Sequence, residues 1–154
     1  MTIKIRPATL DELPTLKAFE QGIIEAERPM DATLKPDPIS YYDLGALIES
    51  QDAEVLVADL DGELVASGYA KKKRSLDYVR PAYHAFIGFL YVAQEHRGKG
   101  INQLVLDGLF SWAKAKDLPE VHLTVYPSNA PALRAYQKAG FRPYLTEMRL
   151  NLEE

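Results

Sequence analysis

The feature that most constrains the fold is a strongly apolar segment that passes through a glycine-containing turn into an amphipathic one. Residues 85–92 are apolar and aromatic, which indicates a buried strand. From Asn102 to Lys116 apolar residues recur at helical spacing, which indicates a helix with one apolar stripe. A helix that directly follows a buried strand must cover the apolar face of a sheet. The chain is therefore expected to pack helices against a sheet.

Patterns elsewhere predict further elements around this unit. Alternation of apolar and polar residues indicates strands at 3–7, 54–60, 64–72, 121–126 and 141–150. Helical spacing indicates helices after the capping pair Thr9 and Glu12, at 41–49 with Ser40 as its cap, and at 130–139. Asp61-Gly62 marks a hairpin, Gly140 a helix end, and residues 29–40 a loop. The order is β-α-α-β-β-β-α-β-α-β, in a single domain over residues 1–154 with a mixed sheet and helices on both faces.

Composition narrows the classes of protein. Of 154 residues 47% are hydrophobic, which suffices for one core, and the net charge of −4 argues against nucleic-acid binding. The absence of cysteine excludes disulfides, thiolate nucleophiles and thiolate metal sites. The N-terminus lacks the apolar stretch of a signal peptide, and no apolar run reaches the length of about 18 residues needed for a membrane span. We therefore expect a cytoplasmic protein without membrane contact.

The turn between the apolar strand and its helix reads Arg97-Gly98-Lys99-Gly100-Ile101-Asn102. Glycine lets the backbone approach a ligand, and the start of a helix attracts anions, so this turn predicts a phosphate site. It is neither a Walker A loop, which needs Gly-Lys-Ser/Thr, nor a dinucleotide fingerprint, which needs a third glycine. An ordinary glycine-rich turn stays open as the alternative.

A second segment, Asn129 to Phe141, follows the strand predicted at 121–126. It fits the pattern Asn-x-x-Ala-x-x-x-Tyr-x-x-x-Gly-Phe. In the turn, Arg97 and Gly100 fit the pattern Gln/Arg-x-x-Gly-x-Gly/Ala. With both patterns present, the chain resembles the GCN5-related N-acetyltransferase (GNAT) family. Asn102 departs from the last position of the turn pattern, and we interpret it as a helix N-cap. The resemblance covers nearly the whole chain and implies a GNAT-like α+β fold with a mostly antiparallel, twisted sheet.

The resemblance also implies a reaction. An amine attacks the thioester of acetyl-CoA directly within a ternary complex, and CoA leaves as product. Tyr136 corresponds to the general acid that protonates the departing thiolate. The residues implied in acetyl-CoA binding are Leu90, Tyr91, Val92, Arg97, Gly98, Lys99, Gly100, Ile101, Asn102, Asn129, Ala132 and Tyr136.

The acceptor and the general base are less defined. The resemblance places the acceptor near the first helices and their loop, where Glu25, Arg28, Asp31, Tyr41 and Tyr42 are candidates. Acidic groups there favour a cationic amine, whereas Arg28 favours a carboxylate-bearing acceptor. Gly88 stands where several family members carry a glutamate base. The base is instead sought among Glu25, Asp31, His84, Glu147 and a water chain.

Remaining expectations concern metals, partners and class. The three histidines are too dispersed along the sequence to indicate a metal site, so none is expected. The acceptor is expected to be a small molecule or a protein amino group. Members of the family are commonly dimers, so self-association is expected. A non-catalytic acyl-CoA-binding module, regulatory or interacting, stays as the alternative function.

Overall fold

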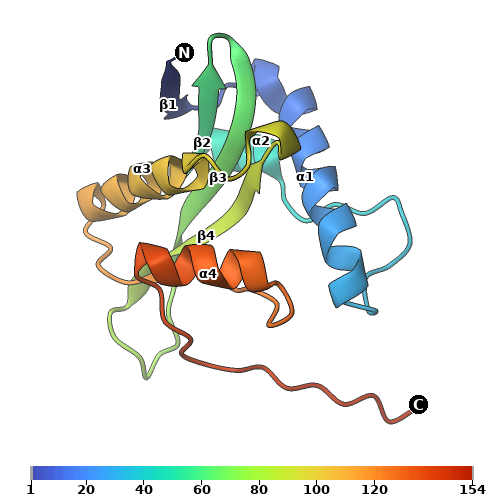
Figure 1. Ribbon diagram of the computed structural model, residues 1–154. Coiled ribbons are helices and arrows are strands. Elements are labelled where there is room, and N and C mark those ends of the chain that lie inside the picture. Colours follow the sequence, from blue (N-terminus) through green and yellow to red (C-terminus); the bar gives the residue numbers. More distant parts are fainter. Residues whose placement is uncertain (1, 154) are drawn as a thin grey trace.

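The computed structural model describes residues 2–153, and its centre is one five-stranded sheet in the order β1-β2-β3-β4-β5 (Figure 1). Neighbouring strands from β1 to β4 are antiparallel, whereas β5 runs parallel to β4. The strands are β1 (Ile3–Pro7), β2 (Ala53–Leu60), β3 (Glu63–Arg74), β4 (Tyr83–Val92) and β5 (Val121–His122). The predicted α+β class with a mixed, mostly antiparallel sheet is confirmed.

Helices cover both faces of the sheet, as predicted. Helices α1 (Leu13–Glu27) and α2 (Leu44–Glu49) lie on one face, and α3 (Ile101–Ala115) and α4 (Ala130–Ala139) lie on the other (Figure 1). The alternation of β2 explains this layering, because Val55 and Val57 pack with α1 while Leu56 and Ala58 pack with α3. Within residues 2–153, no helix is both long and apolar enough to cross a membrane.

Local signals act where the sequence indicates. Asp61 and Gly62 have φ values of 51° and 95°, the left-handed pair that a tight hairpin between β2 and β3 requires. The Glu12 carboxylate accepts the backbone N–H of Thr9 at 2.9 Å, which orders the entry to α1. Gly140 ends α4 with a φ of 110°. These three predictions are confirmed.

Two predicted helix starts are wrong. Helix α2 begins at Leu44, and its cap is Asp43, which accepts the N–H of Ala46 at 3.1 Å. Ser40 does not cap α2, because its hydroxyl donates to the Glu20 carboxylate instead. Helix α3 begins at Ile101 with Gly100 as its cap residue, so Asn102 lies inside the first turn and is not an N-cap.

The predicted final strand at 141–150 is also wrong for the single chain, and β5 is shorter than the predicted 121–126. After Phe141 the chain leaves the molecular body as an extended segment (Figure 1). A strand forms only against a neighbouring edge, and no backbone hydrogen bond joins residues 142–152 to the rest of the described chain. We call residues 142–153 the C-terminal arm.

Candidate functional site

The site begins with an irregularity in β4. Phe89 has a φ of 58°, and the register between β3 and β4 shifts at this point. Two side chains satisfy the displaced backbone: the Ser67 hydroxyl donates to the carbonyl of Phe89 at 3.0 Å, and the Phe89 N–H donates to the Tyr42 hydroxyl at 3.3 Å. Such a bulge bends its strand. The bulge comes after Ala85 and Phe86, the residues of β4 that pair with β5.

The bend leaves the edge of β4 at residues 87–92 without a strand partner on the β5 side, within the part of the chain that the structure describes. The predicted residues Leu90, Tyr91 and Val92 lie on this stretch. Their backbone groups are therefore available to an extended ligand that lies alongside β4.

The glycine turn lies at the end of that free edge. Gly98 and Gly100 have φ values of 78° and 79°, and both have open space where a side chain would stand. Lys99 is exposed. The Arg97 side chain donates from Nε to the carbonyl of Val92 at 2.8 Å, which fixes its charge beside the turn. With Gly100 as its cap residue, α3 has no side-chain cap, so its first N–H groups and two cations form a site suited to an anion.

Tyr91 joins this turn to α1. Its ring stacks on Phe19, with centroids 4.8 Å apart, and the guanidinium of Arg97 lies 5.7 Å from its centroid on the side of the turn. A Cβ at Gly22 would come within 2.8 Å of the same ring. Glycine at position 22 therefore makes room for Tyr91, which serves as a wall between α1 and the turn.

Helix α4 supplies the other predicted residues. Asn129 is its N-cap, since its side-chain oxygen accepts the N–H of Ala132 at 3.3 Å. Tyr136 is half-buried, and burial together with the nearby charge of Glu27 raises its pKa to about 12. The Tyr136 phenol therefore stays protonated at neutral pH, and its hydroxyl has no hydrogen-bond partner within residues 2–153.

Two carboxylate–phenol pairs lie near one another, and the charge of one of them, Glu27, acts on Tyr136. Tyr41 donates to Glu27 at 2.9 Å, and Tyr126 donates to Asp31 at 2.6 Å. Burial raises the pKa of Glu27, whereas hydrogen bonds from Thr33 and Tyr126 lower the pKa of Asp31 to about 2. Two acids four residues apart thus differ in proton affinity, which is the arrangement that assigns different roles to similar groups.

Sequence reasoning missed Glu27 as a candidate. Nothing in its local pattern distinguishes it from the exposed Glu25, because Tyr41 and Tyr136, which define its surroundings, are distant in sequence.

The remaining acceptor candidates are spread over separate places. Arg28 is engaged within its own loop, donating to the carbonyl of Lys35 at 2.8 Å and to Asp37 at 2.6 Å. Glu25 lines a depression of about 260 Å³ with Arg28 and Asp37. Tyr41 also lines a different depression of about 450 Å³, together with Tyr42. Of the five candidates, only Asp31 and Tyr41 belong to the two carboxylate–phenol pairs.

A buried acid holds these tyrosines in place. Glu20 is only 2% exposed, and one of its oxygens accepts the N–H groups of both Tyr41 and Tyr42 at 2.8 Å. Sequence reasoning missed this residue too, although a signal existed. Glu20 lies in the apolar stripe of α1 next to Phe19, where a charge is stable only when it is paired or hydrogen-bonded.

Two of the other base candidates have neighbours of their own. His84 lies near the start of β4, stacked on His122 at 4.0 Å, and burial lowers its pKa. Glu147 lies in the exposed C-terminal arm and pairs with Arg149 at 2.6 Å. At Gly88, a Cβ would come within 2.8 Å of the Tyr69 ring, so this protein has a buried aromatic ring where a strand carboxylate would start.

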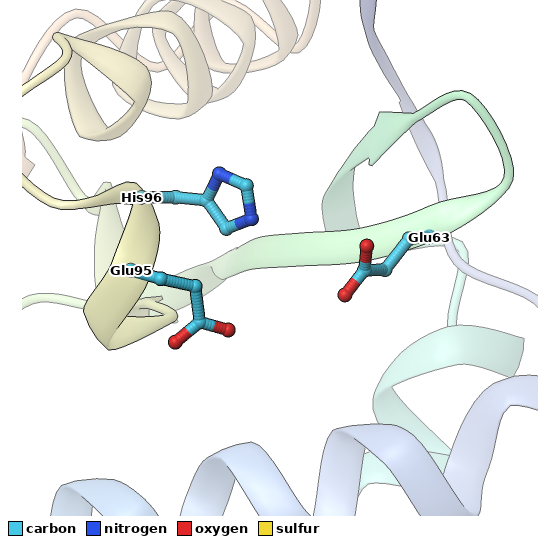
Figure 2. Close-up of side chains that lie close together, drawn as sticks. All are labelled: Glu63, Glu95 and His96. Atoms are coloured by element: carbon cyan, nitrogen blue, oxygen red, sulfur yellow. The ribbon is translucent and has the colours of Figure 1, made fainter.

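One group of potential metal ligands lies near the turn. Glu95 and His96 extend from the turn before Arg97, and Glu63 extends from the start of β3 (Figure 2). Their ligand atoms lie within 4.8 Å of one another, but both carboxylates are exposed to solvent. Exposed acids often gather without a metal, so the expectation of a metal-free protein stays a prediction.

Comparison with known proteins adds to this geometry. Residues 21–141 match the model of the acetyltransferase (GNAT) family. Streptothricin acetyltransferase of Streptomyces lavendulae is 30% identical over 119 residues, which cover 77% of this chain and 60% of that protein. An N-alpha-acetyltransferase of Sulfurisphaera tokodaii is 28% identical over 115 residues, covering 70% of this chain and 67% of that protein. The chain thus spans about three-fifths of the length of the first of these relatives.

Solved structures share the fold at lower identity. A variant of the BH1408 protein of Bacillus halodurans superposes with a TM-score of 0.87 at 22% identity, over 97% of this chain and 99% of that one. A predicted acetyltransferase of Clostridium acetobutylicum, solved with acetyl-CoA, gives a TM-score of 0.75 at 17% identity, over 99% of this chain and 97% of that one. The arrangement of elements around the β4 bulge therefore belongs to a widely shared fold.

Proposed function

Since the chain belongs to the acetyltransferase (GNAT) family, we propose that it transfers the acetyl group of acetyl-CoA to a primary amine of a small molecule or a protein. The observation that carries the proposal is the continuity of three features. The free edge of β4 ends at a turn suited to an anion, and Tyr136, which packs on the same core cluster as Leu90 and Val92, has a protonated hydroxyl without a partner in the described chain. The relatives from Streptomyces and Sulfurisphaera, both named as acetyltransferases, support the same reaction class.

The residues present fit acetyl-CoA. The turn from Arg97 to Asn102 offers helix N–H groups and two cations to the pyrophosphate, with no side chain at Gly98 or Gly100 to obstruct it. The backbone of Leu90–Val92 offers hydrogen bonds to the pantetheine arm, and Asn129 and Ala132 line the facing start of α4.

Acetyl-CoA supplies a thioester carbonyl for attack by the amine. In the proposed mechanism a backbone N–H on the free edge of β4, within Leu90–Val92, polarises that carbonyl, and Tyr136 gives its proton to the departing sulfur. Glu27 accepts the proton that the ammonium group loses before attack, since burial raises the pKa of Glu27. The proton that the nitrogen loses after attack returns to Tyr136. Asp31, ionised above pH of about 2, attracts a cationic amine toward Glu27. The acceptor is thus expected to be cationic.

Replacing the acid tests the first role. Tyr136→Phe keeps the ring and removes the proton, so kcat should fall by about 10²-fold or more while CoA affinity changes little. Tyr78→Phe, at an exposed loop position, is the matched control and should leave kcat unchanged. Thiol release from acetyl-CoA measures kcat, and calorimetry measures affinity. An undiminished rate in Tyr136→Phe would remove this residue from the mechanism.

A second variant tests the base. Glu27→Gln keeps an acceptor for the Tyr41 hydroxyl but cannot take a proton, so kcat/KM at pH 7 should fall by about 10²-fold or more. The deficit should shrink as pH rises, because more of the amine is then already deprotonated in solution. Glu25→Gln, two residues earlier, tests the competing candidate. A larger loss in Glu25→Gln than in Glu27→Gln would transfer the role to Glu25.

The alternative function is acyl-CoA binding without catalysis. The lack of a carboxylate at Gly88 is the observation in its favour. A screen of cationic amines with acetyl-CoA separates the two functions. Thiol release that depends on the amine supports transfer, whereas tight CoA binding without turnover across the screen supports the binding module.

A further inference from the structure

The loop between β3 and β4, together with the strand ends that hold it, is a cationic segment in an acidic chain. Residues 71–83, which we call the β3–β4 tip, contain five cationic side chains: Lys71, Lys72, Lys73, Arg74 and Arg80. The one acid of the tip, Asp77, pairs with Arg74 at 3.5 Å. The chain as a whole has a net charge of −4. A local excess of positive charge in such a chain favours contact with an anionic partner.

The same tip exposes apolar side chains. Leu76, Tyr78 and Val79 are 62%, 86% and 42% exposed. Backbone hydrogen bonds close the loop that carries them, and one of these joins the Ser75 N–H to the Ala82 carbonyl at 2.8 Å. The three side chains belong to neither of the large core clusters on the two faces of the sheet. Apolar side chains that gather at one exposed place mark an interaction site.

The charges surround the tip instead of lying on one face of it. Successive side chains of a strand point to opposite faces of the sheet, so Lys72 and Lys73 lie on opposite sides. The Lys72 ammonium lies 4.4 Å from the centroid of the Tyr83 ring, and that of Lys73 lies 4.8 Å from the centroid of Phe86. The tip therefore combines an apolar apex, Leu76 to Val79, with a collar of cations behind it.

The tip lies far from the glycine turn. It projects from the end of the sheet opposite the β2–β3 hairpin (Figure 1). The tip leads into β4 and the turn follows β4, so the ten residues of this strand separate the two. A strand of that length spans about 30 Å. A surface that meets the tip therefore leaves the turn at Arg97–Asn102 open to acetyl-CoA.

We propose that the β3–β4 tip docks this protein on an anionic lipid surface. Leu76, Tyr78 and Val79 enter the boundary between headgroups and acyl chains, while the collar of cations contacts the anionic headgroups. The expectation of no membrane contact rested on the absence of an apolar run long enough to span a bilayer, which a surface loop does not require. This inference does not depend on the proposed reaction.

The form of the tip favours lipid over other anionic partners. A nucleic acid is bound mainly through its phosphates, so it would use the collar and leave the apolar apex in water. An acidic peptide binds in a groove or along a sheet edge. The tip instead projects from the body, and neither depression described above includes a tip residue. A lipid surface offers apolar and anionic groups at successive depths, in the order in which the tip presents their complements.

Co-sedimentation with lipid vesicles tests the docking. The full chain should sediment with vesicles of equimolar phosphatidylcholine and phosphatidylglycerol, stay in solution with phosphatidylcholine alone, and leave the mixed vesicles at high salt. Fluorescence anisotropy with labelled duplex DNA and a labelled polyglutamate peptide measures binding to the two other anionic partners. No sedimentation with the mixed vesicles, or tighter binding to DNA or polyglutamate than to the vesicles, would overturn the proposal.

Matched variants test the two parts of the tip. Lys72→Glu/Lys73→Glu should weaken vesicle binding by about 10²-fold or more, whereas Lys4→Glu/Lys138→Glu makes the same change in net charge at exposed positions elsewhere and should not weaken it. Tyr78→Ser should weaken binding by about 5–10-fold, whereas Tyr144→Ser, at another exposed tyrosine, should leave it unchanged. Circular dichroism verifies that all four variants fold. Equal binding by either tip variant and its control would overturn the proposal.

Discussion

Glu20 gives the most direct test of how this site is held together. The carboxylate is 2% exposed and accepts two backbone N–H groups, from Tyr41 and Tyr42, at 2.8 Å each. A hydrogen bond to a charged group contributes about 1.5–3 kcal/mol, and Glu20→Ala leaves both N–H donors without their acceptor. We therefore expect Glu20→Ala to lose about 3–5 kcal/mol in the free energy of unfolding. This is a large share of the total for a typical domain, which is about 5–15 kcal/mol.

The assay is thermal unfolding followed by circular dichroism. At about 2–4 °C per kcal/mol for a chain of this size, Glu20→Ala should lower Tm by about 6–20 °C. Glu20→Gln keeps one oxygen for the two N–H groups and should lose about 1–2 kcal/mol, mainly the charge assistance. Glu25→Ala removes an exposed carboxylate from the same helix and should stay within about 0.5 kcal/mol of the parent. Equal Tm values for Glu20→Ala and Glu25→Ala would refute the reasoning.

Three further predictions follow from backbone geometry and charge. Gly100→Ala and Gly62→Ala both place a side chain at a positive φ, although neither new Cβ would meet a neighbour, so each should lose about 1–2 kcal/mol of stability. Calorimetry should find weaker CoA binding for Gly100→Ala only. Gly88→Ala should lose about 1–3 kcal/mol in denaturant unfolding because its Cβ meets the Tyr69 ring, and the loss should shrink in a Tyr69→Leu background; an unchanged loss would exclude that contact as its cause. Asp31 has its pKa lowered from 3.8 to about 2, so its contribution to stability is present above pH of about 4 and is lost as pH falls toward 2. The Tm difference between the parent and Asp31→Asn should therefore close over that range, and a difference that persists at pH 2 would contradict the assignment.

Most of the framework could be predicted because it rests on local signals. The Asp61-Gly62 hairpin, the end of α4 at Gly140 and the alternation of β2 depend only on residues adjacent in sequence. The predicted strand at 141–150 failed for a different reason. Alternation reports that a segment can form a strand with one apolar face, but it does not report which edge, or which chain, the segment pairs with.

The candidate site also combines features that adjacent residues encode with features that depend on distant ones. The turn at Gly98 and Gly100 carries its signal in consecutive residues, so it could be found in the sequence. The surroundings of Glu27 come from residues 14 to 109 positions away, Tyr41 and Tyr136, and no local pattern encodes that proximity. His84 shows the converse, since its chemistry suited a base but the strand direction of β4 places it at the far end from Leu90–Val92.

The hydrogen bond from the Phe89 N–H to the Tyr42 hydroxyl has a thermodynamic consequence. It connects the bent strand proposed to bind acetyl-CoA with the loop that Glu20 holds next to the proposed acceptor groups. If a ligand on one side tightens this contact, the binding free energies of the two substrates become coupled. Linkage then requires that the factor by which acetyl-CoA changes acceptor affinity equals the factor by which the acceptor changes acetyl-CoA affinity. Tyr42→Phe, which keeps the ring and removes the shared hydroxyl, should bring both factors toward one.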